Sequence, residues 1–220
     1  MDRSASGGPV VSEAAVDRTR LVARSRRLNV ATLGYNSLEG VVAIVAGLAA
    51  GSVALLGFGI DSGIELSASV VALWRLSADA DAARRVEVEQ ASHRIIGVLF
   101  LALAGYVAYE AGAALWRREE PRESLVGIAL AAASVVIMPL LARAKRRVGI
   151  ELGSRALTSE ARQTSLCAYL SAILLGGLVL NAWLGWWWAD PVAALAMVPI
   201  IAREGVDGLQ GQPTCTDGCH

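Results

Sequence analysis

The chain has 220 residues, a hydrophobic share of 55% and a mean hydropathy of +0.49, with only 18% charged residues. Twenty basic and 20 acidic residues give a formal net charge of zero, so no electrostatic basis for a nucleic-acid partner exists. Long apolar runs exclude an ordinary water-soluble domain and indicate a polytopic membrane protein.

The first 27 residues are polar and Arg-rich, with no apolar segment typical of a secretory signal. We expect this cytoplasmic arm, residues 1–27, to be loose or to form a surface helix. Six apolar stretches follow, each near the roughly 20 residues that cross a hydrocarbon core. They cover residues 28–50, 52–76, 94–116, 124–143, 153–184 and 191–206. The sequence predicts an all-α bundle of six transmembrane helices over residues 28–206, with a short cytoplasmic tail at 207–220.

The first two stretches contain acids at membrane depth. Asp61 and Glu65 stand one helical turn apart in the second stretch, so their side chains share a face. Each acid costs about 2.5–3.5 kcal/mol at mid-helix, even on lenient insertion scales. The pair predicts an ion-transport site, with a hydrogen-bonded structural pair as the alternative. Glu39, in the first stretch, is either a proton relay or a structural partner, and Asn36 is expected to hydrogen-bond it.

The fifth stretch supplies polar residues that share one helical face: Glu160, Gln163 and Cys167. If this helix begins near residue 153, Cys167 lies about 20 Å along it. That level is comparable with Glu65 on a helix running the opposite way, so the two groups can face each other. Taken singly, Cys167 fits an ordinary small apolar residue and Gln163 a hydrogen bond to another helix.

The basic residues divide very unevenly between the two sides of the predicted bundle. With both termini in the cytoplasm, the outer side receives only Arg117, Arg118 and Arg122, and the other seventeen Lys and Arg lie inside. This distribution satisfies the positive-inside rule, and the Trp triplet at 186–188 is typical of an outer aromatic belt. Asp190 and Pro191 are expected to be the N-cap and first residue of the sixth helix.

The C-terminal tail holds three residues with soft-metal ligand chemistry, Cys215, Cys219 and His220. Their spacing is not that of a closed structural zinc site, and a short Gly-containing tail is also compatible with disorder. A cytoplasmic metal-collecting tail and a disordered tail both remain open. A disulfide is not expected in a reducing cytoplasm.

An ordered set of motifs gives the chain a family resemblance. The set comprises Glu39-Gly, the run Gly-Ser-Val-Ala-Leu-Leu at 51–56, Asp61-x-x-x-Glu65, Glu160-x-x-Gln163-x-x-x-Cys167 and Ala-Asp-Pro at 189–191. Over about residues 29–207 it resembles the membrane domain of cation diffusion facilitators, the proton-coupled zinc and divalent-metal transporters. The family's fifth helix carries Asp-x-x-His-x-x-x-Asp, from which this chain departs. Many members continue into a cytoplasmic ferredoxin-like domain, so this chain looks like a divergent short member that lacks it.

The resemblance implies efflux of a divalent cation by proton antiport with alternating access. The implied metal ligands are Asp61, Glu65, Gln163 and Cys167, with Glu160 as an auxiliary ligand and Glu39 as a proton relay. Because a cysteine thiolate is soft, we expect Zn²⁺, with Cd²⁺ and Co²⁺ as the other candidates, rather than Mg²⁺ or Mn²⁺.

The expected partners are metal ions, protons and the lipid bilayer, and a homodimer is expected from the resemblance alone. We expect no cofactor and no enzymatic activity, because the two histidines lie in a loop and at the terminus. The expected location is the inner membrane of a bacterium. The alternative function is a membrane metal-binding sensor or partner subunit that does not transport.

Overall fold

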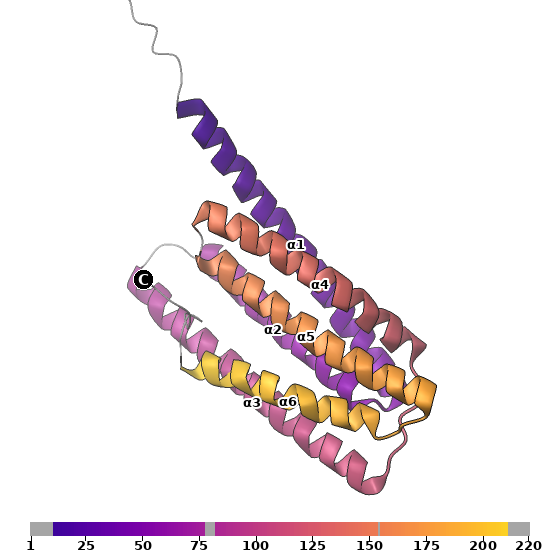
Figure 1. Cartoon of the computed structure of the whole chain (residues 1–220). Coiled ribbons are helices and arrows are strands. Elements are labelled where there is room, and N and C mark those ends of the chain that lie inside the picture. Colours follow the sequence, from indigo (N-terminus) through magenta and orange to yellow (C-terminus); the bar gives the residue numbers. More distant parts are fainter. Residues whose placement is uncertain (1–10, 78–81, 154, 211–220) are drawn as a thin grey trace, which may run out of the picture.

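The computed structural model describes residues 11–77, 82–153 and 155–210, which form six helices and no strand (Figure 1). The helices are α1 (Val11–Ala50), α2 (Val53–Ser77), α3 (Ala82–Arg117), α4 (Leu125–Leu152), α5 (Arg155–Leu184) and α6 (Ala189–Leu209). The predicted all-α class is confirmed for these ranges. The predicted tail site at Cys215, Cys219 and His220 lies outside the described residues.

Three helices extend well beyond the apolar stretches that predict them. α1 begins at Val11, α3 begins at Ala82, and α4 continues to Leu152 through a basic segment. Hydropathy locates only the apolar part of a helix, whereas Ala, Arg, Glu and Leu favour helix in water as well. In Figure 1 the N-terminal part of α1 projects past the ends of the other helices.

Four helical segments are long and apolar enough to cross a membrane. They are Arg20–Ala50, Arg94–Arg117, Leu125–Leu152 and Glu160–Leu184. Within the described ranges, α6 does not meet the same criterion. The 21 residues of α6 include Asp190, Arg203, Glu204 and Asp207, so each of its 18-residue windows holds more than two charged residues. In α2, side chains are described only for residues 53–67, fewer than the 18 that the criterion needs. Six membrane crossings therefore stay a prediction.

α2 occupies the centre of the bundle. It packs against α1, α3, α5 and α6, while α4 pairs with α5 and α3 pairs with α6 along the bundle (Figure 1). Phe58 and Leu55 of α2 are fully buried in the apolar core, together with Leu174 of α5 and Met197 of α6. The acids of α2 are thus carried on a helix that packs against four other helices.

The start of α6 differs from the expected N-cap. α6 begins at Ala189 after Trp188, so Asp190 is already inside the first turn and Pro191 is the third helical residue. The Asp190 carboxylate accepts hydrogen bonds from Ser52 Oγ and from the backbone N–H of Val53, at 2.9 Å, at the beginning of α2. The prediction that Asp190 caps its own helix was wrong, because the carboxylate caps the neighbouring helix instead.

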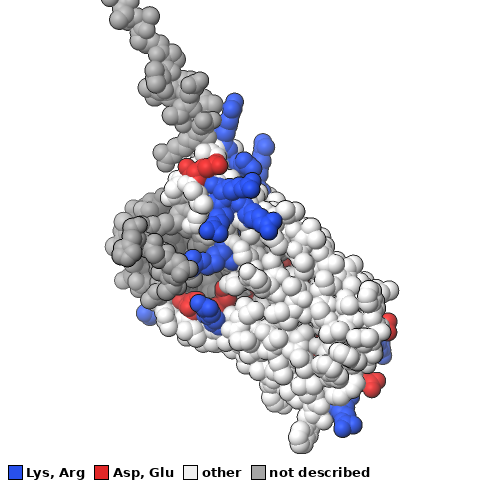
Figure 2. Space-filling view, in the orientation of Figure 1, with Lys and Arg blue, Asp and Glu red and all other residues white. Residues whose placement is uncertain are grey.

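Charged side chains gather at the two ends of the bundle, with a broad uncharged surface between them (Figure 2). One end carries exposed arginines of α1 and α4: Arg20, Arg24, Arg26, Arg27, Arg143, Arg146 and Arg147. The opposite end carries a mixed set between α3 and α4: Arg117, Arg118, Glu119, Glu120, Arg122 and Glu123. Such a separation fits a protein whose middle faces lipid.

Candidate metal centre

Three side chains with metal-ligand chemistry meet in the interior of the bundle. Asp61 and Glu65 come from successive turns of α2, and Cys167 comes from the middle of α5. One ligand atom from each lies within 4.8 Å of the others, and the three residues are only 2%, 7% and 1% exposed. Two ligands of one zinc ion lie no more than about 4.0–4.6 Å apart, since each bond is about 2.0–2.3 Å. Small side-chain adjustments would therefore bring all three onto one ion.

Cys167 and Glu65 already contact each other directly. The Cys167 thiol donates to the Glu65 carboxylate, with Sγ 2.9 Å from Oε1 and 2.8 Å from Oε2. The bond places a proton between a soft and a hard ligand atom. A metal ion bound by both residues would displace that proton, because zinc binds the thiolate rather than the thiol.

Asn36 of α1 brings a third helix to the site. Its side-chain Nδ2 donates to Glu65 Oε2 at 3.3 Å. The sequence-based expectation was a bond to Glu39, one turn along the same helix, but the described partner is Glu65. No local pattern indicates this contact, because it depends on how α1 packs against α2.

Glu39 lies in a separate hydrogen-bonded group. Its Oε1 accepts from Ser134 Oγ of α4, and Ser134 Oγ lies 2.8 Å from the hydroxyl of Tyr35. The Glu39 side chain is 1% exposed, and its Oε2 has no hydrogen-bond partner among the described residues. A buried carboxylate with an unpaired oxygen is costly when ionised, so the group suits a residue that gains and loses a proton.

The other two residues expected at the site are placed less centrally. Gln163 lies on α5 one turn before Cys167 and is half-buried. Glu160 forms an ion pair with Lys145 of α4, with Nζ 3.5 Å from Oε2, and does not belong to the group of three. Metal roles for both residues stay predictions.

Comparisons with known proteins decide the family. The sequence profile of the cation efflux transmembrane domain matches residues 30–209, which is most of the chain. The chain belongs to the cation efflux family. This is the family, also called cation diffusion facilitators, that the motifs of the sequence resemble, so that expectation is confirmed.

A relative of this cation efflux protein occurs in the cyanobacterium Synechocystis. It is an uncharacterized transporter, 28% identical over 153 residues, which make up 67% of this chain and 49% of that protein. The chain therefore spans about half the length of this curated relative. Together with the long apolar helices, the family match identifies an integral membrane protein with several membrane crossings.

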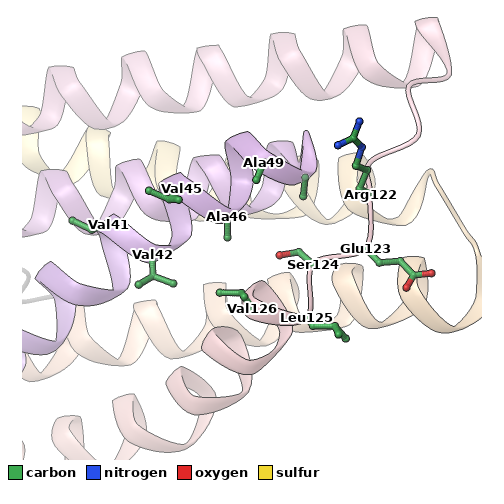
Figure 3. Close-up of a pocket in the computed structure, with 11 residues that line it drawn as sticks. Val41, Val42, Val45, Ala46, Ala49, Arg122, Glu123, Ser124, Leu125 and Val126 are labelled. Carbon is green, nitrogen blue, oxygen red and sulfur yellow. The ribbon is translucent and has the colours of Figure 1, made fainter.

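A surface pocket of the cation efflux domain lies away from the acids. It has a volume of about 590 Å³ and lies between α1 and the start of α4 (Figure 3). Val41, Val42, Val45 and Ala46 line it, whereas the side chains of Arg122 and Glu123 at its end point outward. The walls of this groove are mostly apolar, and its one carboxylate, Glu123, points outward, so the buried group of three is the better candidate for the functional site.

Proposed function

We propose that the chain carries a divalent metal cation, with zinc as the favoured ion, out of the cytoplasm through the site formed by Asp61, Glu65 and Cys167. The observation that carries this proposal is that two carboxylates of α2 and a thiol of α5 lie close together and buried inside a cation efflux domain. Charges at this depth are expensive unless a counter-ion or protons compensate them. A transported cation would compensate these charges in the loaded site, and the protons exchanged for it would compensate them in the empty site.

The donor set determines which metal we propose. Two carboxylate oxygens and a thiolate suit zinc, and the sulfur additionally favours Cd²⁺ and Co²⁺ over Mg²⁺ or Mn²⁺. Gln163, one turn from Cys167, and Glu160, paired with Lys145, are proposed as auxiliary residues that the ion meets as it enters or leaves.

Proton antiport follows from the chemistry of the same residues. Metal binding requires deprotonated ligands, so loading the site releases protons and protonation expels the ion. The bond between Cys167 and Glu65 holds one such proton. We further propose Glu39 as a proton relay, since hydrogen bonds connect it through Ser134 of α4 to the hydroxyl of Tyr35 on α1.

We propose six crossings with both termini in the cytoplasm, in the inner membrane of a bacterium. The uneven distribution of Lys and Arg supports this orientation, and the uncharged surface between the charged ends in Figure 2 fits a bundle that spans the membrane. A homodimer stays a prediction from family resemblance.

Flux in proteoliposomes tests the proposal. We would measure zinc movement under an imposed pH gradient for the wild type, for Asp61→Asn and for Glu120→Gln, an exposed acid at the end of the bundle. The expected result is gradient-dependent flux that Asp61→Asn abolishes and Glu120→Gln leaves unchanged. Absence of flux for zinc, cadmium and cobalt alike in folded protein would contradict transport and favour a metal-binding sensor.

A further inference from the structure

We propose that Asn36 supplies a fourth ligand, its side-chain oxygen, to the cation bound by Asp61, Glu65 and Cys167. The inference rests on the proposed metal site and adds a third helix, α1, to the two that carry the other ligands. In the ligand set predicted from the sequence, Gln163 is the neutral fourth ligand, and this inference gives that place to Asn36.

The position of Asn36 places its amide at the site. Nδ2 lies 3.3 Å from Oε2 of Glu65, which is one of the three grouped ligand residues. The side chain is only 9% exposed. A buried amide next to a buried carboxylate is therefore part of the same polar pocket rather than of the lipid-facing surface of α1.

Two oxygen atoms of this pocket lack hydrogen-bond partners within the described part of the chain: Oδ1 of Asn36 and Oδ2 of Asp61. Leaving a buried polar atom unpaired costs about 1–3 kcal/mol, so each of these two atoms requires an explanation. A bound cation would provide one, because both atoms are acceptors and a metal ion satisfies acceptors only. For Asn36 Oδ1 this requires the amide to turn, since Nδ2 now faces the Glu65 carboxylate.

The amide is suited to both states of the site. Without metal, Nδ2 donates to the Glu65 carboxylate, as the structure shows. The terminal torsion of an asparagine is broad and roughly two-fold, so a half-turn exchanges Nδ2 for Oδ1. After that turn the oxygen faces the same carboxylate across a bound cation. One side chain thus stabilises the empty site by donating a proton and the loaded site by offering an oxygen.

Coordination number supports the assignment. Zinc in proteins is most often held by four ligands in a tetrahedron, and the group of three falls one short. Gln163 is half-buried, whereas Asn36 is buried and bonded to a member of the group. A neutral fourth oxygen completes the shell without adding another negative charge to a low-dielectric interior.

Binding of Co²⁺ to the purified full chain in detergent tests the inference, because tetrahedral Co²⁺ reports its ligands in its ligand-field spectrum. We would titrate the wild type, Asn36→Leu, Asn36→Asp and Asn36→His, with Asp61→Asn as the test of the site itself. The matched control is Asn181→Leu, which removes another buried amide, one that donates to the carbonyl oxygen of Pro121 and lies outside the group of three. Thermal unfolding verifies that each variant is folded.

We expect Asn36→Leu to weaken Co²⁺ affinity by at least about tenfold, the lower end of what loss of a metal-site partner costs. Asn36→Asp, which keeps an oxygen donor, should bind as tightly as the wild type or more tightly. Asn36→His should shift the ligand-field bands, since nitrogen replaces oxygen in the shell. Asn181→Leu should leave affinity and spectrum almost unchanged.

The outcomes separate this inference from the function on which it rests. Wild-type affinity and spectrum in Asn36→Leu and Asn36→His, with binding lost in Asp61→Asn, would overturn the role of Asn36 alone. Affinity unaffected by Asp61→Asn, or no Co²⁺ binding by the wild type, would overturn the metal site and the inference together.

Discussion

Asp190 and Ser52 stand 138 residues apart in the chain, and Ser52 donates its hydroxyl proton to the Asp190 carboxylate. The other carboxylate oxygen accepts from the backbone N–H of Val53, the first residue of α2. An anion at a helix N-terminus is stabilised by the unpaired amides and the helix dipole there. The contact therefore joins the first turn of α6 to the beginning of the helix that carries Asp61 and Glu65.

Replacing Asp190 with asparagine should loosen this connection. Asp190→Asn removes the charge and turns one of two acceptor atoms into a donor that faces other donors, at a cost of about 1–3 kcal/mol. We expect a lower midpoint of thermal unfolding in detergent. Glu120→Gln, which changes an exposed acid, is the control and should melt like the wild type. Equal midpoints for all three proteins would show that the carboxylate contributes nothing to holding α2 and α6 together.

The ion pair between Lys145 and Glu160 gives a second prediction. The Lys145 side chain is 5% exposed and that of Glu160 is 44% exposed, so loss of Glu160 leaves a charged amine without its partner in a buried place. Glu160→Gln should destabilise the protein by about 1 kcal/mol, a value kept small because water reaches the glutamate. Thermal unfolding of the single variant measures this loss.

A double-mutant cycle isolates the pair. In Lys145→Met/Glu160→Gln the buried charge is gone as well, so the double variant should be more stable than additivity of the single changes predicts. Strictly additive effects would mean that the two residues do not interact in solution.

Local periodicity explains which parts of the site were predictable from sequence. The spacing of Asp61 and Glu65 places both on one face of any helix, and the rise per residue places Cys167 at the level of Glu65. The predicted partners of Asn36 and Asp190 were wrong, because the actual partners lie on another helix and these contacts depend on how the helices pack. Glu39 likewise meets Ser134 of α4, a contact that nothing near Glu39 in the sequence indicates.

The sulfur of Cys167 should set the preference of the site for soft metals. In Cys167→Ser the hydroxyl still donates to Glu65, but an alcohol is a poor zinc ligand at neutral pH. We expect the affinity for Cd²⁺ to fall by about 10–100-fold, and the affinity for Mn²⁺, which prefers oxygen ligands, to change little. Competition titrations of the purified protein give both values. An unchanged ratio of the Cd²⁺ and Mn²⁺ affinities would exclude the sulfur from the metal shell.

The packing of α3 against α6 depends on Gly97. A Cβ atom added there would lie 2.7 Å from the carbonyl oxygen of Gly205, 2.7 Å from the amide nitrogen of Leu209 and 2.9 Å from the carbonyl carbon of Gly208. All three are backbone atoms, so the clash cannot be relieved by a side-chain rotation. Gly97→Ala should therefore force the helices apart and cost about 1–3 kcal/mol.

Gly105 provides the matched control on the same helix, because a Cβ atom there has no neighbour within 4 Å. Gly105→Ala should leave the unfolding midpoint unchanged or raise it slightly, since alanine favours helix over glycine. Small residues let membrane helices approach closely, and the attraction between such helices comes largely from that close contact. If the two alanine variants unfold at the same temperature, the backbones of α3 and α6 do not approach as closely at Gly97 as the structure shows.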